Sequence, residues 1–250
     1  MRPPFLRGFW KLAWVETKIF AREPMGFVGT LAVPVVVFVA LGRAFGAARP
    51  ESVALDLPFN TAILAALLIA VTAVQSLVAI ISIYREGGIL KRLRATPLSP
   101  ATILGAHVVV KLGFTTVSLG LLLLAGKRLF PGVMQVDVLS FSLAVLLGTW
   151  SILSLGFVIA SLVPTARFAQ PIGAIVLYPM LALSGLFFPV DRLPGALRAL
   201  AWLLPTTHTV ALLQGIWEGA GWGAHWMDAA ALVALFVFYT ALSTRVFRWE

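Results

Sequence analysis

Cysteine is absent from the 250 residues, and charged residues are scarce. The first absence excludes disulfide frameworks, thiol nucleophiles and cysteine-based metal sites. The second excludes an ordinary soluble domain, because only 12% of the residues are charged and 60% are hydrophobic, whereas soluble domains carry roughly 25% charged residues. The composition predicts an integral membrane protein. Its net charge of +9 then relates to membrane topology, and no nucleic-acid partner is expected.

Recognisable catalytic and nucleotide-binding motifs are also missing. His107, His208 and His225 are far apart in the sequence, none begins an HExxH pair, and His107 is expected at the membrane interface. The stretch AGKR at 125–128 lacks the spacing and the Ser or Thr of a phosphate-binding loop. We therefore expect no enzyme activity, no metal site and no cofactor bound by this chain itself.

Six apolar runs are each long enough to cross a membrane as a helix. They lie at 25–42, 58–83, 103–125, 138–163, 171–190 and 227–247. The polar and apolar alternation of barrel strands is absent. The predicted fold is all-α and integral to the membrane, with six transmembrane helices in a single domain over 1–250.

The distribution of Lys and Arg predicts the orientation. Twelve of these residues fall on the side of the two termini and the 84–102 loop, and six fall on the other side. Lys111 lies about two turns inside the third predicted span, and we expect its side chain to reach back to the richer side. The excess places both termini in the cytosol.

Residues 1–24 form a predicted amphipathic helix lying in the membrane interface. Its basic stripe consists of Arg7, Lys11, Lys18 and Arg22. Leu6, Phe9, Trp10, Ala13 and Phe20 gather on the opposite side. This pattern is typical of an interfacial anchor, and the alternative is a lever that also contacts a cytosolic partner.

The cytosolic stretch REGGILKRLRATPLSP, at 85–100, predicts a short amphipathic helix. The Gly87-Gly88 pair permits a bend after the second span, and Leu90 and Leu93 share one side of the turns that follow. So short a helix gains stability by docking into a groove on another protein. The alternative is a loop whose charges only orient the chain.

The external connection, 191–226, is too apolar for a solvated loop. It predicts two short re-entrant helices, with Thr206 or Thr207 as N-cap of the second. These helices form either a lid over an exit route or a passive cap.

Polar side chains in the spans are few. Thr72, Gln75 and Ser76 of the second span, with Tyr178 of the fifth, are candidates for a substrate path, and helix packing is the alternative. Every Asp and Glu lies outside the spans or at their edges, so energy for uphill transport would come from elsewhere.

Two long motifs carry a resemblance to a known family. YREGGILKRLRATPLSP, and LALSGLFFPVDRLPGALRALAWLLPTTHTVALLQGIW about 90 residues later, resemble the ABC-2 type transporter permeases, in particular the drug-resistance and polysaccharide-export branch. The first motif implies a coupling helix that binds a separate ATPase. The candidate coupling residues are Arg85, Glu86, Gly88, Leu90, Lys91, Arg92, Leu93 and Arg94. Tyr84 stands where the family commonly has an acidic residue, and Gly87 where it commonly has a basic one.

The second motif implies an external gate at Gly185, Leu186, Phe187, Phe188 and Pro189. The resemblance implies the membrane subunit of an exporter in the cytoplasmic (inner) membrane. A second copy of the permease, membrane lipid and a cassette ATPase holding ATP and Mg would be its partners. The substrate would be amphipathic, drug-like or linked to a lipid or polysaccharide. The alternative is a membrane assembly protein that recruits a cytosolic partner without transport.

Overall fold

The computed structural model describes residues 4–22, 24–46, 60–89, 100–130, 136–163 and 165–246. Within these ranges the regular structure is helical and contains no strand. The long helices are α1 (Pro4–Arg22), α2 (Pro24–Gly46), α3 (Thr61–Glu86), α5 (Pro100–Leu129), α6 (Val138–Leu162), α7 (Ala166–Ala182), α9 (Pro205–Trp217) and α11 (Trp226–Val246). Three shorter elements are η1 (Val190–Arg192), α8 (Gly195–Trp202) and α10 (Gly221–Ala224). The predicted all-α class is confirmed.

Five helices of the described chain are long and apolar enough to cross a membrane: α2, α3, α5, α6 and α11. Helices α8 and α9, bent by 79° at the break between them, meet the same test only when taken together, which makes a sixth candidate. The fifth span predicted at 171–190 differs, because α7 has 17 residues and ends at Ala182. The Ser184 hydroxyl donates to Leu181 O at 2.7 Å, and Gly185 turns the chain with a φ of 88°.

Side chains and prolines set several helix starts. The Asn60 side chain accepts hydrogen bonds from the amides of Ala62 and Ile63 at 2.9 and 3.3 Å, which caps α3. Asp137 caps α6 in the same way, through the Leu139 amide at 3.2 Å. Proline, which has no amide hydrogen to leave unpaired, is the first residue of α2 and α5.

Helices α3 and α6 form the centre of the bundle. Buried residues make up 67% of the candidate span in α3 and 78% of that in α6, compared with 22% in α2 and 11% in α11. Helix α3 packs against α2, α5, α6 and α7, and α6 also packs against α9 and α11. The outer helices therefore carry the faces that lipid or another protein would cover.

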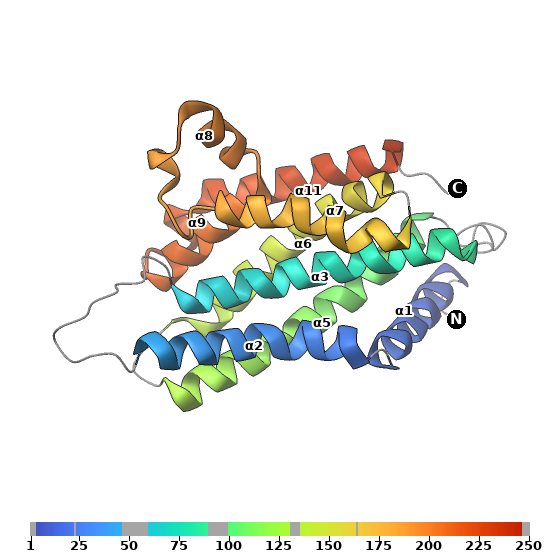
Figure 1. Ribbon diagram of the computed structural model, residues 1–250, viewed down its shortest axis with the longest axis horizontal. Helices are drawn as coiled ribbons and strands as arrows, with labels where there is room; N and C mark the ends of the chain where they lie inside the picture. The colour runs from blue at the N-terminus through green and yellow to red at the C-terminus, as the bar shows by residue number, and fades with distance from the viewer. Residues whose placement is uncertain are drawn as a thin grey trace.

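The two ends of the bundle differ in what they carry. In Figure 1, α1 and the last turns of α3 and α11 lie toward one end, and α8 stands out from the bundle near the other. The two helices predicted within 191–226 are present as α8 and α9, although Thr206 and Thr207 do not cap α9. Its N-cap position is Leu204, and the Thr206 hydroxyl donates to Met180 O of α7 at 3.0 Å. Whether this segment enters the membrane stays a prediction.

Candidate functional site

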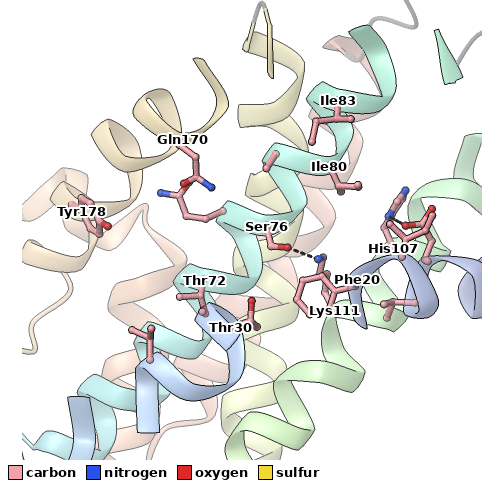
Figure 2. A pocket seen from close by; sticks show the side chains of 17 residues that line it. Phe20, Thr30, Thr72, Ser76, Ile80, Ile83, His107, Lys111, Gln170 and Tyr178 are labelled. Atoms are coloured by element: carbon pink, nitrogen blue, oxygen red, sulfur yellow. Dashed lines mark hydrogen bonds and ion pairs between the residues drawn. The ribbon is translucent and has the colours of Figure 1, made fainter. Parts of the chain in front are cut away.

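A cavity of about 320 Å³ lies between α1, α2, α3, α5 and α7. Figure 2 shows Thr72, Ser76 and Ile80 of α3 along one wall, with Gln170 and Tyr178 of α7 on one side and Phe20 and Lys111 on the other. Its lining combines hydroxyl and amide groups with aliphatic side chains. A cavity with this mixture accommodates a molecule that has both polar and apolar parts.

The four residues predicted for a substrate path all line this cavity, although they come from two helices that are far apart in the sequence. The Thr72 hydroxyl donates to Ile69 O at 3.0 Å, and Gln75 Oε1 is buried without a hydrogen-bond partner. Ser76 bonds to Lys111, and Tyr178 is exposed. Contact of these side chains with a substrate stays a prediction.

Lys111 does not reach solvent, as snorkelling would require, although whether its side chain points towards the richer side of the membrane stays a prediction. Its side chain is only 4% exposed, and Nζ donates to Ser76 Oγ at 2.5 Å (Figure 2). Nζ also lies 4.1 Å from the centre of the Phe20 ring, in a cation–π arrangement. The ammonium group is held inside the bundle, at the wall of the cavity.

A buried polar cluster next to the cavity attaches α1 to the bundle. The Tyr84 hydroxyl of α3 donates to Glu16 Oε1 at 2.6 Å, and His107 Nδ1 of α5 lies 3.5 Å from Glu16 Oε2. Glu16, Tyr84 and His107 are 5%, 6% and 2% exposed. Burial raises the pKa of Glu16, while the Tyr84 hydrogen bond and the Lys111 charge act in the opposite direction.

Sequence reasoning missed this cluster. It expected His107 at the membrane interface, which stays a prediction, and did not foresee that the side chain would be buried against Glu16. A signal was present for Glu16, since Phe9, Ala13, Glu16 and Phe20 are spaced by 4, 3 and 4 residues on one stripe of α1. An acid in the middle of an apolar stripe requires a partner when that stripe is buried. The identity of the partners, Tyr84 and His107, depends on tertiary packing.

Arg85, predicted to contact a partner ATPase, points into the bundle. Its guanidinium donates to Ala160 O at 2.9 Å and to Val163 O, and Nη1 lies 3.5 Å from Ser161 O. These carbonyls are at the end of α6, where no further turn of the helix provides amide donors. Arg85 therefore fixes the end of α3 to the end of α6.

The other predicted coupling residues divide into two groups. Glu86 is exposed, and Gly88 has a φ of 65°, so the chain bends after α3 as predicted from the glycine pair. Leu90, Lys91, Arg92, Leu93 and Arg94 lie outside the described residues. Their role in binding an ATPase stays a prediction.

The predicted external gate forms the turn between α7 and η1. Leu186 is 1% exposed and packs into the main core, whereas Phe188 is 66% exposed. The Leu186 amide lies 3.4 Å from Ser184 Oγ. The turn is thus anchored by Leu186 and exposes Phe188, and its role as a gate stays a prediction.

A second polar cluster joins α9 to α11 at the far end of the bundle. His208 Nδ1 lies 2.9 Å from Asp228 Oδ1, and His225 Nδ1 lies 3.0 Å from Asp228 Oδ2. His208 Nε2 lies 3.0 Å from Trp202 O, a second acceptor, so both contacts are hydrogen bonds only when both ring nitrogens of His208 carry hydrogen. Sequence separation had suggested that these histidines were unrelated.

Neither cluster has the arrangement of a metal centre. Within the described part of the chain, no group of three His, Cys, Asp or Glu side chains could hold a metal ion. In both clusters a carboxylate contacts side chains from other segments of the chain. This arrangement joins helices and provides no activated nucleophile.

Comparison with known proteins identifies the family. The sequence profile of the ABC-2 type transporter family matches residues 7–217. The chain belongs to this family, whose members are membrane transport permeases and not themselves catalytic.

Individual relatives match over shorter stretches. Nodulation protein J of Rhizobium meliloti (strain 1021) is 32% identical over 95 residues, 38% of this chain and 36% of that protein. Nodulation protein J of Rhizobium leguminosarum bv. viciae is 41% identical over 61 residues, 24% of each chain. The inner membrane transport permease YhhJ of Escherichia coli (strain K12) is 27% identical over 159 residues, 60% of this chain and 41% of that protein. The chain thus spans between a quarter and two fifths of the length of these relatives.

Proposed function

We propose that the chain is the permease subunit of an ATP-binding cassette exporter in the cytoplasmic membrane, with both termini in the cytosol. Two copies would enclose the translocation path, and a separate ATPase would bind ATP and Mg. The observation that carries the proposal is the cavity beside α3, which puts hydroxyl and amide groups among apolar helices. Family membership and the Lys and Arg distribution support the same conclusion.

The outer faces of α2 and α7 support pairing with a second copy. Val28 and Val36 of α2, and Ile175 and Tyr178 of α7, are between 55% and 72% exposed, and both helices line the cavity. A second permease packed on these faces would close the cavity on its open side. We expect that copy to be identical to the first.

The cavity lining supports an amphipathic substrate. Lys111, Ser76 and Gln75 provide polar groups, whereas Ile19 and Ile80 provide aliphatic walls. A drug-like molecule, or the lipid-linked end of a larger polar one, satisfies both parts of such a lining. YhhJ is named a transport permease, which favours transport over recruitment of a partner without transport.

Coupling to the ATPase rests on Leu90 and Leu93. Burial of each leucine in a groove would contribute about 1.5–3 kcal/mol to binding. The double change Leu90→Ser with Leu93→Ser keeps every charge and should weaken ATPase binding by about 100-fold or more. Co-purification of the ATPase with the permease measures binding. Stimulation of ATP hydrolysis by amphipathic substrates, measured in proteoliposomes, reports coupling.

Arg92→Gln with Arg94→Gln is the matched control. Exposed charges are screened, so this pair should weaken binding only a few-fold. A silent leucine pair in a correctly inserted protein, together with a large effect of the arginine pair, would show a loop that acts only through charge. Binding of a cytosolic protein without ATP-dependent transport by the wild type would favour the assembly role.

A further inference from the structure

Two neighbouring residues in the last turn of α3 attach it to opposite parts of the bundle. Tyr84 is 6% exposed and donates to Glu16 of α1. Arg85 donates to the end of α6, on another side of α3. Figure 1 shows this end of α3 between α1 and the region where α6 ends and α7 begins. We call the last turn of α3 the junction, the contact of Tyr84 with Glu16 its Tyr84 arm, and the contacts of Arg85 with the end of α6 its Arg85 arm.

The Arg85 arm replaces a missing feature of α6. The last turn of α6 has no basic residue of its own, and its C-cap, Val163, donates only back to Ile159 O. The partial negative charge of the unpaired carbonyls at a helix end favours a cation there. Arg85 supplies that cation from α3. One of its acceptors, Val163 O, lies three residues before Ala166, the first residue of α7.

The residue type matters for this arm. Nη2 of the guanidinium donates to both Ala160 O and Val163 O, and Nη1 of the same rigid fork lies 3.5 Å from Ser161 O, so the group reaches three carbonyls at once. A lysine carries its charge at one point and cannot span the same set in a fixed geometry. Glutamine retains hydrogen-bond donors but loses the charge.

The junction stands directly before the bend at Gly87 and Gly88. Gly87 is the C-cap of α3 and its amide donates to Ile83 O, while Gly88 has positive φ. Chain beyond this bend is the segment expected to bind the ATPase. A displacement of that segment reaches the bundle first through Tyr84 and Arg85.

We propose that Arg85 is a positioning residue that transmits movement of the coupling segment to the α6–α7 connection, rather than a docking residue for the ATPase. This inference rests on the proposed function. Loss of Arg85 should leave the ATPase bound and active, while a smaller fraction of the ATP that it hydrolyses drives transport. The two roles are therefore separable by experiment.

The test uses Arg85→Gln and Arg85→Lys in the full chain, with Arg167→Gln as the matched control. Arg167 is an exposed arginine in the first turn of α7, and the distribution of Lys and Arg places it on the same side of the membrane as Arg85. We expect Arg85→Gln to retain ATPase co-purification within about twofold and to lower transport per ATP about tenfold. Arg85→Lys should recover part of that ratio, and Arg167→Gln should leave it unchanged.

A structural readout separates uncoupling from misfolding. Spin labels at Val109→Cys on α5 and Leu162→Cys at the end of α6, both exposed positions, report the α6 end relative to the bundle. The chain has no native cysteine to interfere. ATP binding should change this distance in the wild-type complex and not in Arg85→Gln.

The outcomes are distinguishable. Loss of ATPase co-purification in proportion to transport would assign Arg85 to docking and overturn the inference, as would an unchanged ratio of transport to ATP. Failure of the wild type to bind an ATPase would instead refute the proposed function. In that case hydrogen exchange of the permease alone still tests the arm, because Arg85→Gln should speed exchange at the end of α6 and not in α1. Equal exchange in both proteins would overturn it.

Discussion

The molecule has two polar clusters in which a carboxylate holds separate segments together, and they differ in how far they are exposed to solvent. At the α1 end, Glu16 joins Tyr84 and His107, and all three side chains are at most 6% exposed. At the α8 end, Asp228 joins His208 and His225, whose exposures are 16%, 12% and 28%. Each carboxylate links separate helices. The first, which we call the sealed cluster, is almost fully buried apart from the sides of Glu16 and His107 that face the cavity, and losing a partner costs most there.

The comparison suggests different mechanical roles for the two ends. A sealed network with an adjoining arginine arm favours one fixed arrangement of α1, α3 and α6. A cluster partly open to water exchanges its hydrogen bonds with solvent at smaller cost, so α8 and α9 can separate from α11 more easily. Under the proposed function, the rigid end receives movement from the ATPase and the looser end responds at the exit.

The largest expected effect is a difference in labelling, because the two ends of the bundle should be accessible from opposite sides of the membrane. A cysteine in place of Ser99 should react with a membrane-impermeant maleimide only from the cytosol, because the Lys and Arg excess lies on that side. A cysteine in place of Ala220, which is exposed near the second cluster, should react only from outside. Labelling of intact cells and inverted vesicles measures both. External labelling at position 99 would reverse the assigned ends.

Breaking the sealed cluster should have the next largest effect. Glu16→Ala leaves the Tyr84 hydroxyl and the His107 ring without their carboxylate, at a cost of about 1–3 kcal/mol for each stranded group. Hydrogen exchange in α1 should accelerate by tenfold or more. Lys18→Ala removes an exposed charge of the same helix and should change little. Similar exchange in the two variants would mean that α1 is held mainly by its apolar contacts.

Breaking the open cluster should cost less. Asp228→Asn preserves the shape of the side chain but removes the charge that both histidines contact, and should destabilise the α9–α11 contact by about 1–2 kcal/mol. Thermal unfolding and hydrogen exchange in α8 and α9 measure the loss, with the exposed Asp191→Asn as control. Because the clusters share no residue, the effects of Asp228→Asn and Glu16→Ala should add. Strong coupling between them would remove the distinction between the ends.

The smallest expected effect is a pH dependence of the sealed cluster. Burial raises the folded-state pKa of Glu16 above its ordinary value of 4.5. The stabilisation linked to that proton is complete below pH 4.5 and is lost as the pH rises through the folded-state pKa. Exchange in α1, corrected for the intrinsic pH dependence of amide exchange, should therefore accelerate with rising pH in the wild type and not in Glu16→Gln. The opposite slope would show that the Tyr84 bond and Lys111 charge outweigh burial.

The sequence predicted the features that depend on local pattern. Long apolar runs indicated the helices, the glycine pair indicated the bend seen at Gly88, and the apolar connection indicated α8 and α9. The end of α7 was missed because apolar residues continue past Ala182, whereas Ser184 and Gly185 turn the chain. Composition alone does not distinguish an apolar turn packed on a core from a further turn of helix.

The candidate site was predicted less completely, for a tertiary reason. Thr72, Gln75 and Ser76 fall on one side of α3 by spacing alone, which sufficed to select them. The inward turn of Arg85 was not predictable, because its acceptors are carbonyls of Ala160 and Val163, about 75 residues away. Backbone carbonyls are present at every residue and give no sequence signal. His208 and Asp228 are likewise brought together only by the packing of α9 on α11.

The most direct test of the proposal that the α1 end of the bundle receives movement from an ATPase is site-specific photocrosslinking in cells. A photoreactive residue at Leu93 should form a crosslink to a soluble protein that carries an ATP-binding cassette, because this side chain is expected in the docked face. The same residue at Ala220 should form none. Absence of that crosslink at position 93 in an inserted, transport-competent permease, or its appearance at position 220, would contradict the account.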